Sequence, residues 1–335
     1  MQVIHNKNTN RYGTFHMLQV LGLGAILVLC LSCNTGASKM EVVEYRNMPV
    51  EVWVPVSNMR QRVGGDPGAS AELPLPGHLY IYIVVTGQSP DDVSVTCQHF
   101  AGIEDAWVPD RENLYHYGGK LNLPIVENAT ARIYAVASKD ELQLGNQPVT
   151  EDDVRNLVLD MTKPDNQNIN LRDVYSAPQN GEGIEIEGYG ENNDNIRVSA
   201  VCYHVGAKVD FMWNLTETFL AAYPKGRVVS LGLTGLPQKG YLFRPTENEP
   251  LSGAETGAWE FPLEEGNNIY GRTDTYVFQP SGGQLNWQVT MTDDASDQVP
   301  VTERTDGTVS PEVVPGSVVW YRLYFTINSL KGINL

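Results

Sequence analysis

Short runs of alternating apolar and polar residues are the feature that most restricts how this chain can fold. The longest run lies near the C-terminus, where every second residue is apolar: Val319, Tyr321, Leu323, Phe325 and Ile327. Successive side chains of a β-strand point to opposite faces, so this pattern predicts a strand that buries one face. The same period appears over residues 50–56, 209–213 and 285–291, and residues 79–85 are continuously apolar, as in a buried strand.

Turn-forming residues separate these runs. The 335 residues include 31 glycines and 20 prolines, spread along the chain. Many short strands divided by turns indicate an all-β fold. Pro55 restricts the strand at residues 50–56 to a sheet edge, or to a position where its missing N–H is not needed.

One segment departs from the β pattern. Thr150 precedes three acidic residues, and Asp153 lies three positions after it, an arrangement close to a capping box. Acidic side chains in a first turn are stabilised by the helix dipole. We therefore expect one short helix over residues 151–159, in the first half of the chain.

The chain is long enough for two domains of ordinary size. Residues 176–183 are rich in turn formers and contain no apolar anchor, so we place the boundary there. This gives an N-terminal domain of residues 73–177 and a C-terminal domain of residues 178–335. Residues 33–72 hold one strand and a Gly-rich segment ahead of both.

Residues 1–32 have the features of a signal peptide. Lys7 and Arg11 precede a 14-residue apolar run, which is shorter than the ~20 residues needed to span a bilayer. The run ends in Leu31-Ser32-Cys33, and a small residue before a cysteine is what lipoprotein signal peptidase requires. We therefore expect Cys33 to carry the lipid of an exported bacterial lipoprotein. A plain signal peptide or a short anchor helix is the alternative.

The charge of the chain restricts its partners. The formal net charge is −17, and removal of residues 1–32 takes away two basic side chains and no acidic one, which leaves −19. Such a surface repels phosphate backbones, so we expect no nucleic-acid partner. It also disfavours a polybasic membrane contact, and membrane attachment would depend on the lipid.

The sequence contains no persuasive catalytic or metal-binding motif. There is no nucleophile elbow, metalloprotease helix, phosphate loop or Cys-x-x-Cys pair, so we expect no enzyme, cofactor or metal. Cys97 and Cys202 lie far apart and are each followed two residues later by a histidine, which is too few ligands for a metal site. We interpret both as separate buried thiols. The acidic loop at residues 191–195 lacks EF-hand spacing and is better explained as a polar hairpin tip.

Aromatic residues offer one candidate binding site. Four aromatic residues, Trp107, Tyr115, Tyr117 and Tyr45, fall in stretches that we interpret as loops, where they could form a platform for glycans. Most other tryptophans lie on alternating strands, where core packing explains them.

Three motifs follow one another in the second half: residues 204–214 (HVGAKVDFMWN), 241–248 (YLFRPTEN) and 271–280 (GRTDTYVFQP). With residues 132–137 before the expected helix and the terminal strand at 320–332, they resemble the fimbrillin family of Bacteroidetes, the subunits of lipoprotein-derived (type V) pili. The resemblance covers most of residues 73–335. It implies two tandem transthyretin-like β-sandwich domains, with the short helix in the first.

The resemblance also implies a function in cell adhesion. Fimbrillins reach the outer membrane as lipoproteins and assemble with other fimbrial subunits by strand addition, in which an extended segment of one subunit fills a groove in the next. An arginine-directed protease trims polymerising members, and the possible sites here are Arg46, Arg60 and Arg62, with the last two preferred. An untrimmed chain would stay lipid-anchored at the cell surface, and a trimmed chain would enter the fimbrium. Anchor, stalk and tip roles remain open.

Two other functions compete with this one. A surface lipoprotein that binds glycans for a polysaccharide uptake system would use Trp107, Tyr115 and Tyr117. A hydrolase would use two of the many carboxylates, although the acidic pairs of the sequence have the pattern of solvated turns.

Overall fold

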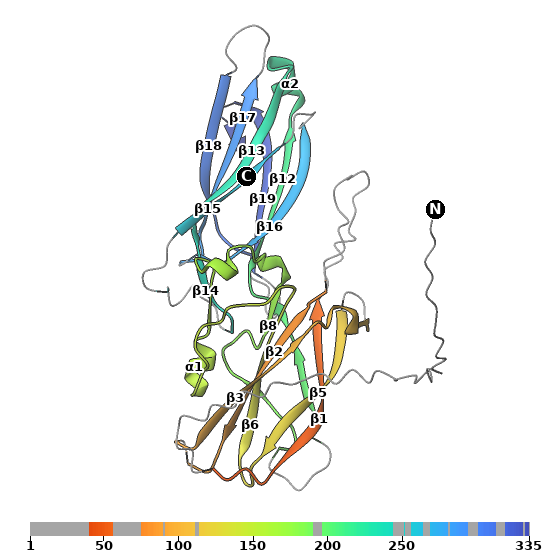
Figure 1. Cartoon of the computed structure of the whole chain (residues 1–335). Helices are drawn as coiled ribbons and strands as arrows, with labels where there is room; N and C mark the ends of the chain where they lie inside the picture. Colours follow the sequence, from red (N-terminus) through yellow and green to blue (C-terminus); the bar gives the residue numbers. More distant parts are fainter. Residues whose placement is uncertain are drawn as a thin grey trace, which may run out of the picture.

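The chain folds into two β-sandwiches stacked end to end (Figure 1). The computed structural model describes residues 40–55, 75–89, 91–110, 114–189, 196–243, 251, 256–263, 269–280, 282–293, 301–312, 319–330 and 332–334. The expected all-β fold is confirmed. The signal peptide, Cys33, Val56, Arg60 and Arg62 lie outside the described residues. None of the helices within these ranges is long and apolar enough to cross a membrane.

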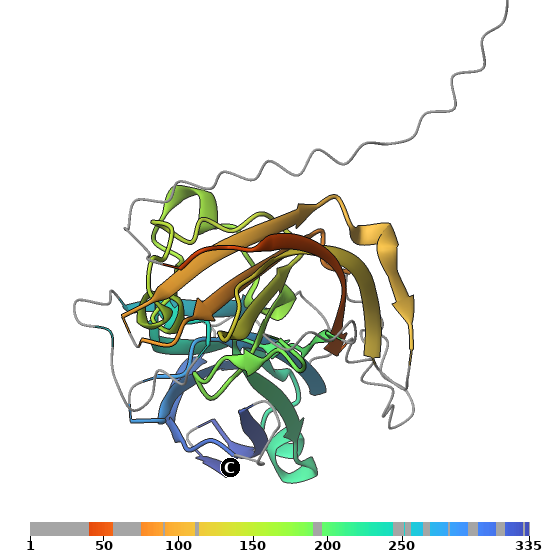
Figure 2. The same cartoon turned by 90° about the horizontal axis from the view of Figure 1, so that it is seen from below.

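The first sandwich consists of two sheets. One sheet has the order β10 (Val198–Val201), β1 (Glu44–Pro55), β5 (Leu114–Ile125) and β4 (Trp107–Pro109). The other has the order β11 (Tyr203–His204), β8 (Val174–Ala177), β6 (Thr130–Ser138), β2 (His78–Thr86) and β3 (Val93–Ala101), with β9 (Ile184–Glu185) also paired to β6. Viewed from below, β1 runs beside β5 along the whole strand (Figure 2).

The second sandwich also has two sheets. One has the order β16 (Tyr270–Val277), β12 (Ala207–Leu215), β19 (Trp320–Ser329) and β20 (Gly332–Asn334). The other has the order β15 (Thr256–Pro262), β13 (Gly226–Pro237), β17 (Leu285–Asp293) and β18 (Val301–Val309). The alternating apolar residues of β12, β17 and β19 all point into the core between these sheets.

Both sandwiches have the same topology. The first strand of each, β1 or β12, lies between an antiparallel neighbour, β5 or β16, and a parallel one, β10 or β19. In the opposite sheets, the orders β8-β6-β2-β3 and β18-β17-β13-β15 correspond strand by strand. The molecule therefore repeats one seven-stranded arrangement, although its sequence shows no fixed-period repeat.

The division between the sandwiches falls later in the chain than expected. Strands β9, β10 and β11, which span residues 184–204, pair with the first sandwich, and Cys202 is part of its core. The second core begins at Ala207. The turn-rich residues 176–183 are therefore a connection inside the first sandwich and not the boundary between residues 177 and 178 that their composition suggested.

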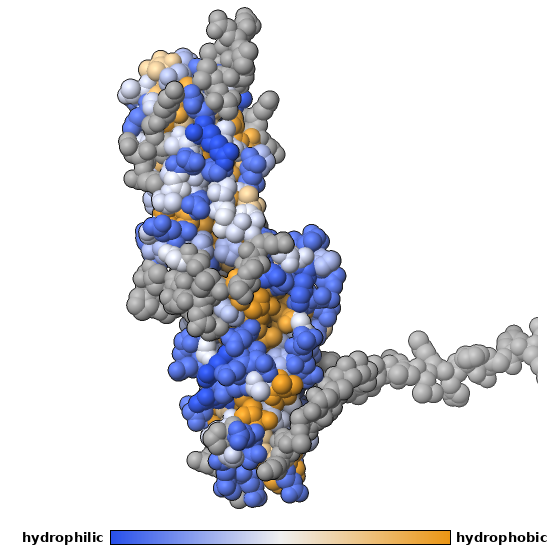
Figure 3. All heavy atoms as spheres, turned by 90° about the vertical axis from the view of Figure 1, so that its left-hand side faces the viewer, coloured by the Kyte–Doolittle hydropathy of each residue, from blue (hydrophilic) through white to orange (hydrophobic). Residues whose placement is uncertain are grey.

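A third hydrophobic core joins the two sandwiches. It combines Tyr82 and Tyr134 from the outer face of the first sandwich with Phe243 and Phe278 from the second half of the chain. Beside it, β14 (Lys239–Tyr241) pairs with β7 (Val158–Asp160), so one small sheet contains a strand from each half. Figure 3 shows apolar patches near the middle of one side of the molecule, among predominantly polar atoms.

The expected helix is present but shorter than predicted. Helix α1 (Glu151–Arg155) begins with the predicted capping box, in which the Thr150 hydroxyl accepts from the Asp153 N–H and the Asp153 carboxylate accepts from the Thr150 N–H. The prediction of a helix over the second half of residues 151–159 is wrong, because Val158–Asp160 forms β7 and bonds to β14. A second helix, α2 (Glu217–Ala222), was not predicted, and Thr216 caps it.

Candidate functional site

Strand β1 and the groove that holds it form the candidate site. All twelve residues of β1 are in register with β5, and Val50–Trp53 are also in register with β10. The strand is thus central in its sheet over these four residues and at the edge elsewhere. We call the groove between β5 and β10 the β1 seat.

Two prolines limit the pairing of β1 with β10. Alternate residues of a strand bond to a parallel neighbour, and Trp53 is one of them, because its carbonyl accepts from the Cys202 N–H at 2.8 Å. Pro49 and Pro55 lie an even number of residues from Trp53, so their backbone also faces β10, but a proline has no N–H to donate. The ladder therefore ends at both prolines. Pro55 therefore lies at an edge of the sheet, where its missing N–H is not needed, and both expected conditions hold.

Three valines fix β1 to the core. Val50, Val52 and Val54 alternate along the strand, and their side chains are completely buried in the first sandwich. Burial of a side chain of this size contributes roughly 1.5–3 kcal/mol. Removal of β1 would therefore open an apolar groove lined by residues such as Leu121, Leu123 and Val198.

The opposite face of β1 carries one further attachment. The Trp53 indole N–H donates to Asp110 Oδ2 at 2.8 Å, and its ring stacks on His116 with centroids 4.9 Å apart. His116 is also the register partner of Trp53 on β5. This contact holds the C-terminal end of β1 from the solvent side, while the valines hold it from the core.

Arg46, one of the three predicted cleavage residues, lies inside β1. It is in register with Leu123 of β5, and its side chain forms an ion pair with Glu44. A protease binds its substrate as an extended, unpaired segment, so cleavage at Arg46 requires β1 to separate from β5. Arg60 and Arg62 stay predictions, because both lie outside the described residues.

The four aromatic residues predicted to form a glycan platform lie on strands and not on loops, and Tyr45 is an exposed residue of β1. Trp107 of β4 and Tyr117 of β5 are buried, with ring centroids 5.5 Å apart, and the Trp107 indole N–H donates to Pro76 O at 2.8 Å. Tyr115 is half-buried and packs against the same core. Neither buried ring offers a face for stacking. The alternation of the sequence could have predicted this strand, because Tyr115 and Tyr117 share one face of β5 with the buried Leu121.

Cys97 and Cys202 are free thiols, as expected from their separation in the sequence. Burial raises the pKa of each thiol to about 12, so neither is a thiolate at neutral pH. The histidines that follow them stand in different surroundings: His99 contacts His78 at 3.0 Å, and His204 is buried between Tyr175 and Tyr276. Across the described ranges, no three His, Cys, Asp or Glu side chains converge as metal ligands.

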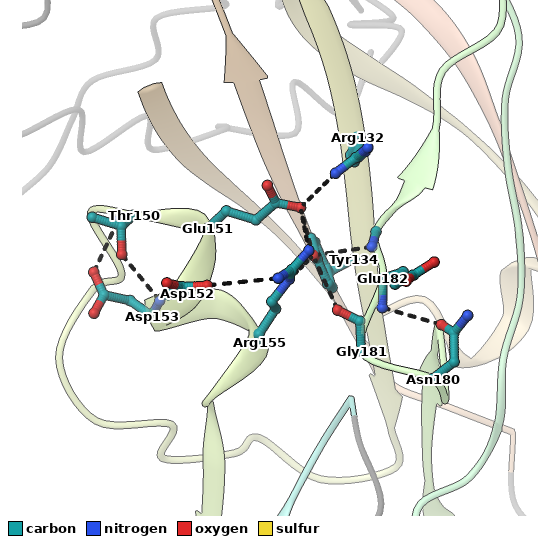
Figure 4. Close-up of polar contacts among 11 residues, drawn as sticks. Arg132, Tyr134, Thr150, Glu151, Asp152, Asp153, Arg155, Asn180, Gly181 and Glu182 are labelled. Carbon is teal, nitrogen blue, oxygen red and sulfur yellow. Dashed lines mark hydrogen bonds and ion pairs between the residues drawn. The ribbon is translucent and has the colours of Figure 1, made fainter. Parts of the chain in front are cut away.

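The polar cluster beside α1 has a structural role (Figure 4). The Tyr134 hydroxyl of β6 donates to Glu151 Oε1 at 2.8 Å and accepts from the Gly183 N–H at 3.0 Å. Arg132 and Arg155 form ion pairs with the same Glu151 carboxylate, at 3.3 and 3.7 Å. The cluster attaches α1 and the turn before β9 to the sheet.

The fold and the β1 seat define a class of protein: two tandem β-sandwiches, each with its first strand inserted between an antiparallel and a parallel neighbour. No family model matches the sequence, and no curated protein matches it. The fold is similar to that of a candidate cell adhesion protein from Parabacteroides distasonis, with a TM-score of 0.50 and 14% identity over 85% of this chain and 89% of that chain. At this identity the likeness shows a shared fold.

Two further solved structures are also similar. One is a candidate cell adhesion protein from Bacteroides uniformis, with a TM-score of 0.42 and 12% identity over 85% of this chain and 94% of that chain. The other is the fimbrial anchor protein Mfa2 from Porphyromonas gingivalis, with a TM-score of 0.39 and 10% identity over 83% of this chain and 91% of that chain.

Proposed function

We propose that this chain is a non-enzymatic subunit or anchor of a type V fimbrium, which supports cell adhesion. The observation that carries the proposal is the β1 seat. The Parabacteroides distasonis protein of the same fold is described as a candidate cell adhesion protein, which supports the same function. In this proposal the chain is exported as a lipoprotein through Cys33, and it resides at the outer membrane or, after trimming, in the fimbrium.

The β1 seat supports assembly by strand addition. A segment from another subunit with an apolar residue at every second position would replace Val50, Val52 and Val54 in the core and would recover the main-chain bonds to β5. Strand β19 has such a pattern, but it is bonded to both β12 and β20 in its own sandwich. The incoming strand would therefore be a segment other than β19.

Cleavage and strand replacement can be tested on the purified protein. An arginine-specific protease should cut at Arg60 or Arg62 and release β1, after which the trimmed chain should form multimers, as measured by light scattering after size-exclusion chromatography. The double variant Arg60→Ala with Arg62→Ala should lose this rapid cut, retain β1 and stay monomeric. Mass spectrometry identifies the cut.

A peptide provides the control for the groove itself. A synthetic peptide of residues 44–55 should bind the trimmed chain and block multimer formation, whereas the same peptide with Val50→Asp, Val52→Asp and Val54→Asp should do neither. A trimmed chain that stays monomeric and binds neither peptide would contradict strand addition. Glycan uptake, the alternative function, stays a prediction, but the structure buries two of the three residues assigned to it.

A further inference from the structure

The outer face of the sheet β16-β12-β19 is buried at one end and exposed to solvent at the other. Near the first sandwich its residues are buried, among them Tyr276, Lys208 and Asp210. Further along the same strands, Met212 is 43% exposed, Tyr324 is 40% exposed and Tyr270 is 72% exposed. This sheet lies on the right of the upper sandwich in Figure 1.

The exposed residues are neighbours on one face. Met212 is in register with Arg272 on one side and with Tyr324 on the other, and Asn214 is in register with Tyr270. Side chains that stand opposite each other on adjacent strands are ~5 Å apart at Cβ, so these groups adjoin. We call Met212, Asn214, Tyr270, Arg272 and Tyr324 the distal platform.

A buried carboxylate holds the polar group of the distal platform in place. Asp210 is fully buried and accepts two hydrogen bonds from Arg272, from Nε at 2.9 Å and from Nη2 at 2.6 Å. A bidentate contact fixes the plane of a guanidinium. Arg272 is therefore held in one orientation beside Met212 and Tyr324. The polar group of the distal platform is thus in place before any ligand binds.

The charges around the distal platform balance. Arg272 pairs with Asp210, Lys208 pairs with Asp274 at 3.3 Å, and Arg322 pairs with Glu312 at 3.1 Å. The formal charge of these six groups is zero, in a chain whose net charge is −17. The face therefore suits an uncharged ligand, while the charge of the whole chain repels an acidic one at long range.

The size of the distal platform points to a small ligand. It covers three strands and two rows of side chains, which corresponds to roughly 10 Å by 7 Å from strand and residue spacings. A stable protein interface buries about 800 Å² on each partner, far more than this footprint. Tyrosine side chains present an apolar ring and a polar tip, which is the chemistry that a sugar ring with its C–H face and hydroxyl edge complements.

We propose that the distal platform binds an uncharged oligosaccharide. The rings of Tyr270 and Tyr324 and the Met212 side chain pack against the sugar rings, and Asn214 and Arg272 form hydrogen bonds to hydroxyl groups. The glycan-binding surface thus lies on a sheet face of the second sandwich, far along the chain from Trp107 and Tyr117. This inference goes beyond the proposed function and does not depend on strand addition.

Affinity electrophoresis in native gels tests the proposal. Gels that contain mannan, galactomannan or dextran present neutral sugars, and gels that contain polygalacturonate or chondroitin sulfate present acidic ones. The purified protein should be retarded by at least one neutral polysaccharide and by neither acidic one. Tyr324→Ala and Tyr270→Ala should each weaken the retardation about tenfold or more, as expected for a tyrosine at the centre of a small binding site.

Tyr45→Ala is the matched control, because Tyr45 is 60% exposed and lies in the first sandwich. It should leave the retardation unchanged. Tyr270 is 72% exposed, so Tyr270→Ala should fold and keeps the test valid even if Tyr324→Ala unfolds. Absence of retardation by all three neutral polysaccharides, equal retardation of wild type and Tyr270→Ala, or stronger retention by an acidic polysaccharide would overturn the proposal. Self-association that Tyr270→Ala abolishes, without sugar binding, would assign the face to a second copy of the chain instead.

Discussion

His204 is buried at the junction of the sandwiches, where its ring lies between Tyr175 and Tyr276 at centroid distances of 4.6 and 4.7 Å. Burial lowers its pKa to about 4, because the imidazolium form loses its hydration there. In the unfolded chain the pKa is near the ordinary value of 6.5. Between these two values the unfolded chain binds more protons than the folded one.

The free energy of unfolding should therefore fall as the pH drops from about 6.5 to about 4, by up to ~3 kcal/mol from this residue. Urea denaturation of wild type and His204→Leu at pH 7 and pH 4.5 measures the effect. Carboxylates contribute equally to both proteins, so the difference between the two losses isolates His204. Equal losses in wild type and variant would show that the histidine does not titrate in this window.

Gly119 gives a second prediction at the scale of single residues. A Cβ at Gly119 would lie 2.7 Å from the ring of Tyr117, which is itself packed against Trp107, whereas a Cβ at Gly118 would meet nothing closer than His116 at 3.6 Å. Gly119→Ala should therefore destabilise the protein by about 1–3 kcal/mol through overpacking. Gly118→Ala, one residue along the same strand, should not. Chemical denaturation of both variants measures the difference, and similar stabilities would contradict the packing argument.

At the scale of elements, β1 combines strong attachment with limited pairing. Its three valines are fully buried, yet only four of its residues are paired on both sides. Local opening of such a strand exposes its backbone without unfolding the rest of the molecule. The rate of cleavage at Arg46 reports on that opening, because Arg46 is paired to β5 in the closed state.

Val52→Ala is made in the double variant Arg60→Ala with Arg62→Ala, so that no other predicted cut releases β1 first. It should lower the stability of the closed strand by about 2 kcal/mol, from two lost methyl groups and the cavity that remains. This corresponds to a roughly 30-fold larger open population and an equal increase in the rate of cleavage after Arg46 by an arginine-specific protease. Glu51→Ala changes an exposed residue of the same strand and should leave the rate unchanged. Mass spectrometry of timed digests measures both rates, and equal rates for the two variants would refute the role of Val52.

Sequence patterns predicted the elements that are stabilised locally. The capping box at Thr150 and the alternation in β1, β12, β17 and β19 are properties of neighbouring residues, and all are confirmed. The patterns failed where a distant partner decides the outcome. Residues 158–160 form a strand because β14, about eighty residues later, pairs with them. The helical periodicity of neighbouring residues contains no information about that distant partner.

The candidate site was only partly predictable for the same reason. The alternating valines of β1 were visible in the sequence, but its parallel pairing with β10 joins residues about 150 positions apart. The distal platform could not be predicted from the sequence, because its tyrosines lie on the solvent face of their strands. Alternation of apolar and polar residues distinguishes the two faces of a strand but not the residues within one face. Only the register of β16, β12 and β19 brings Tyr270, Met212 and Tyr324 together.

At the scale of the whole molecule, the third core makes the sandwiches one unit. Phe243 is fully buried there, and its ring meets Tyr134 and Tyr82 edge-on at centroid distances of 5.1 and 6.3 Å. Because Phe243 belongs to the second half and both tyrosines to the first, this contact couples the two folding units. We expect wild-type protein to unfold in a single transition.

Phe243→Ala should destabilise the protein by about 3–5 kcal/mol and divide the transition into two, as each sandwich unfolds separately. Differential scanning calorimetry measures both effects. Phe261→Ala removes an exposed ring from β15 and should preserve the single transition. Two transitions in the wild type would show that the third core does not couple the sandwiches.

The shared topology of the sandwiches has a mechanical consequence. In the second sandwich the chain enters at the start of β12 and the last long strand ends at the end of β19, and these parallel strands are in register over eight residue pairs. Tension applied between those points loads the whole ladder in shear, so the bonds resist together and do not open one after another. In the first sandwich the corresponding pair, β1 and β10, shares only four residue pairs. Under a pulling force, the first sandwich should yield before the second.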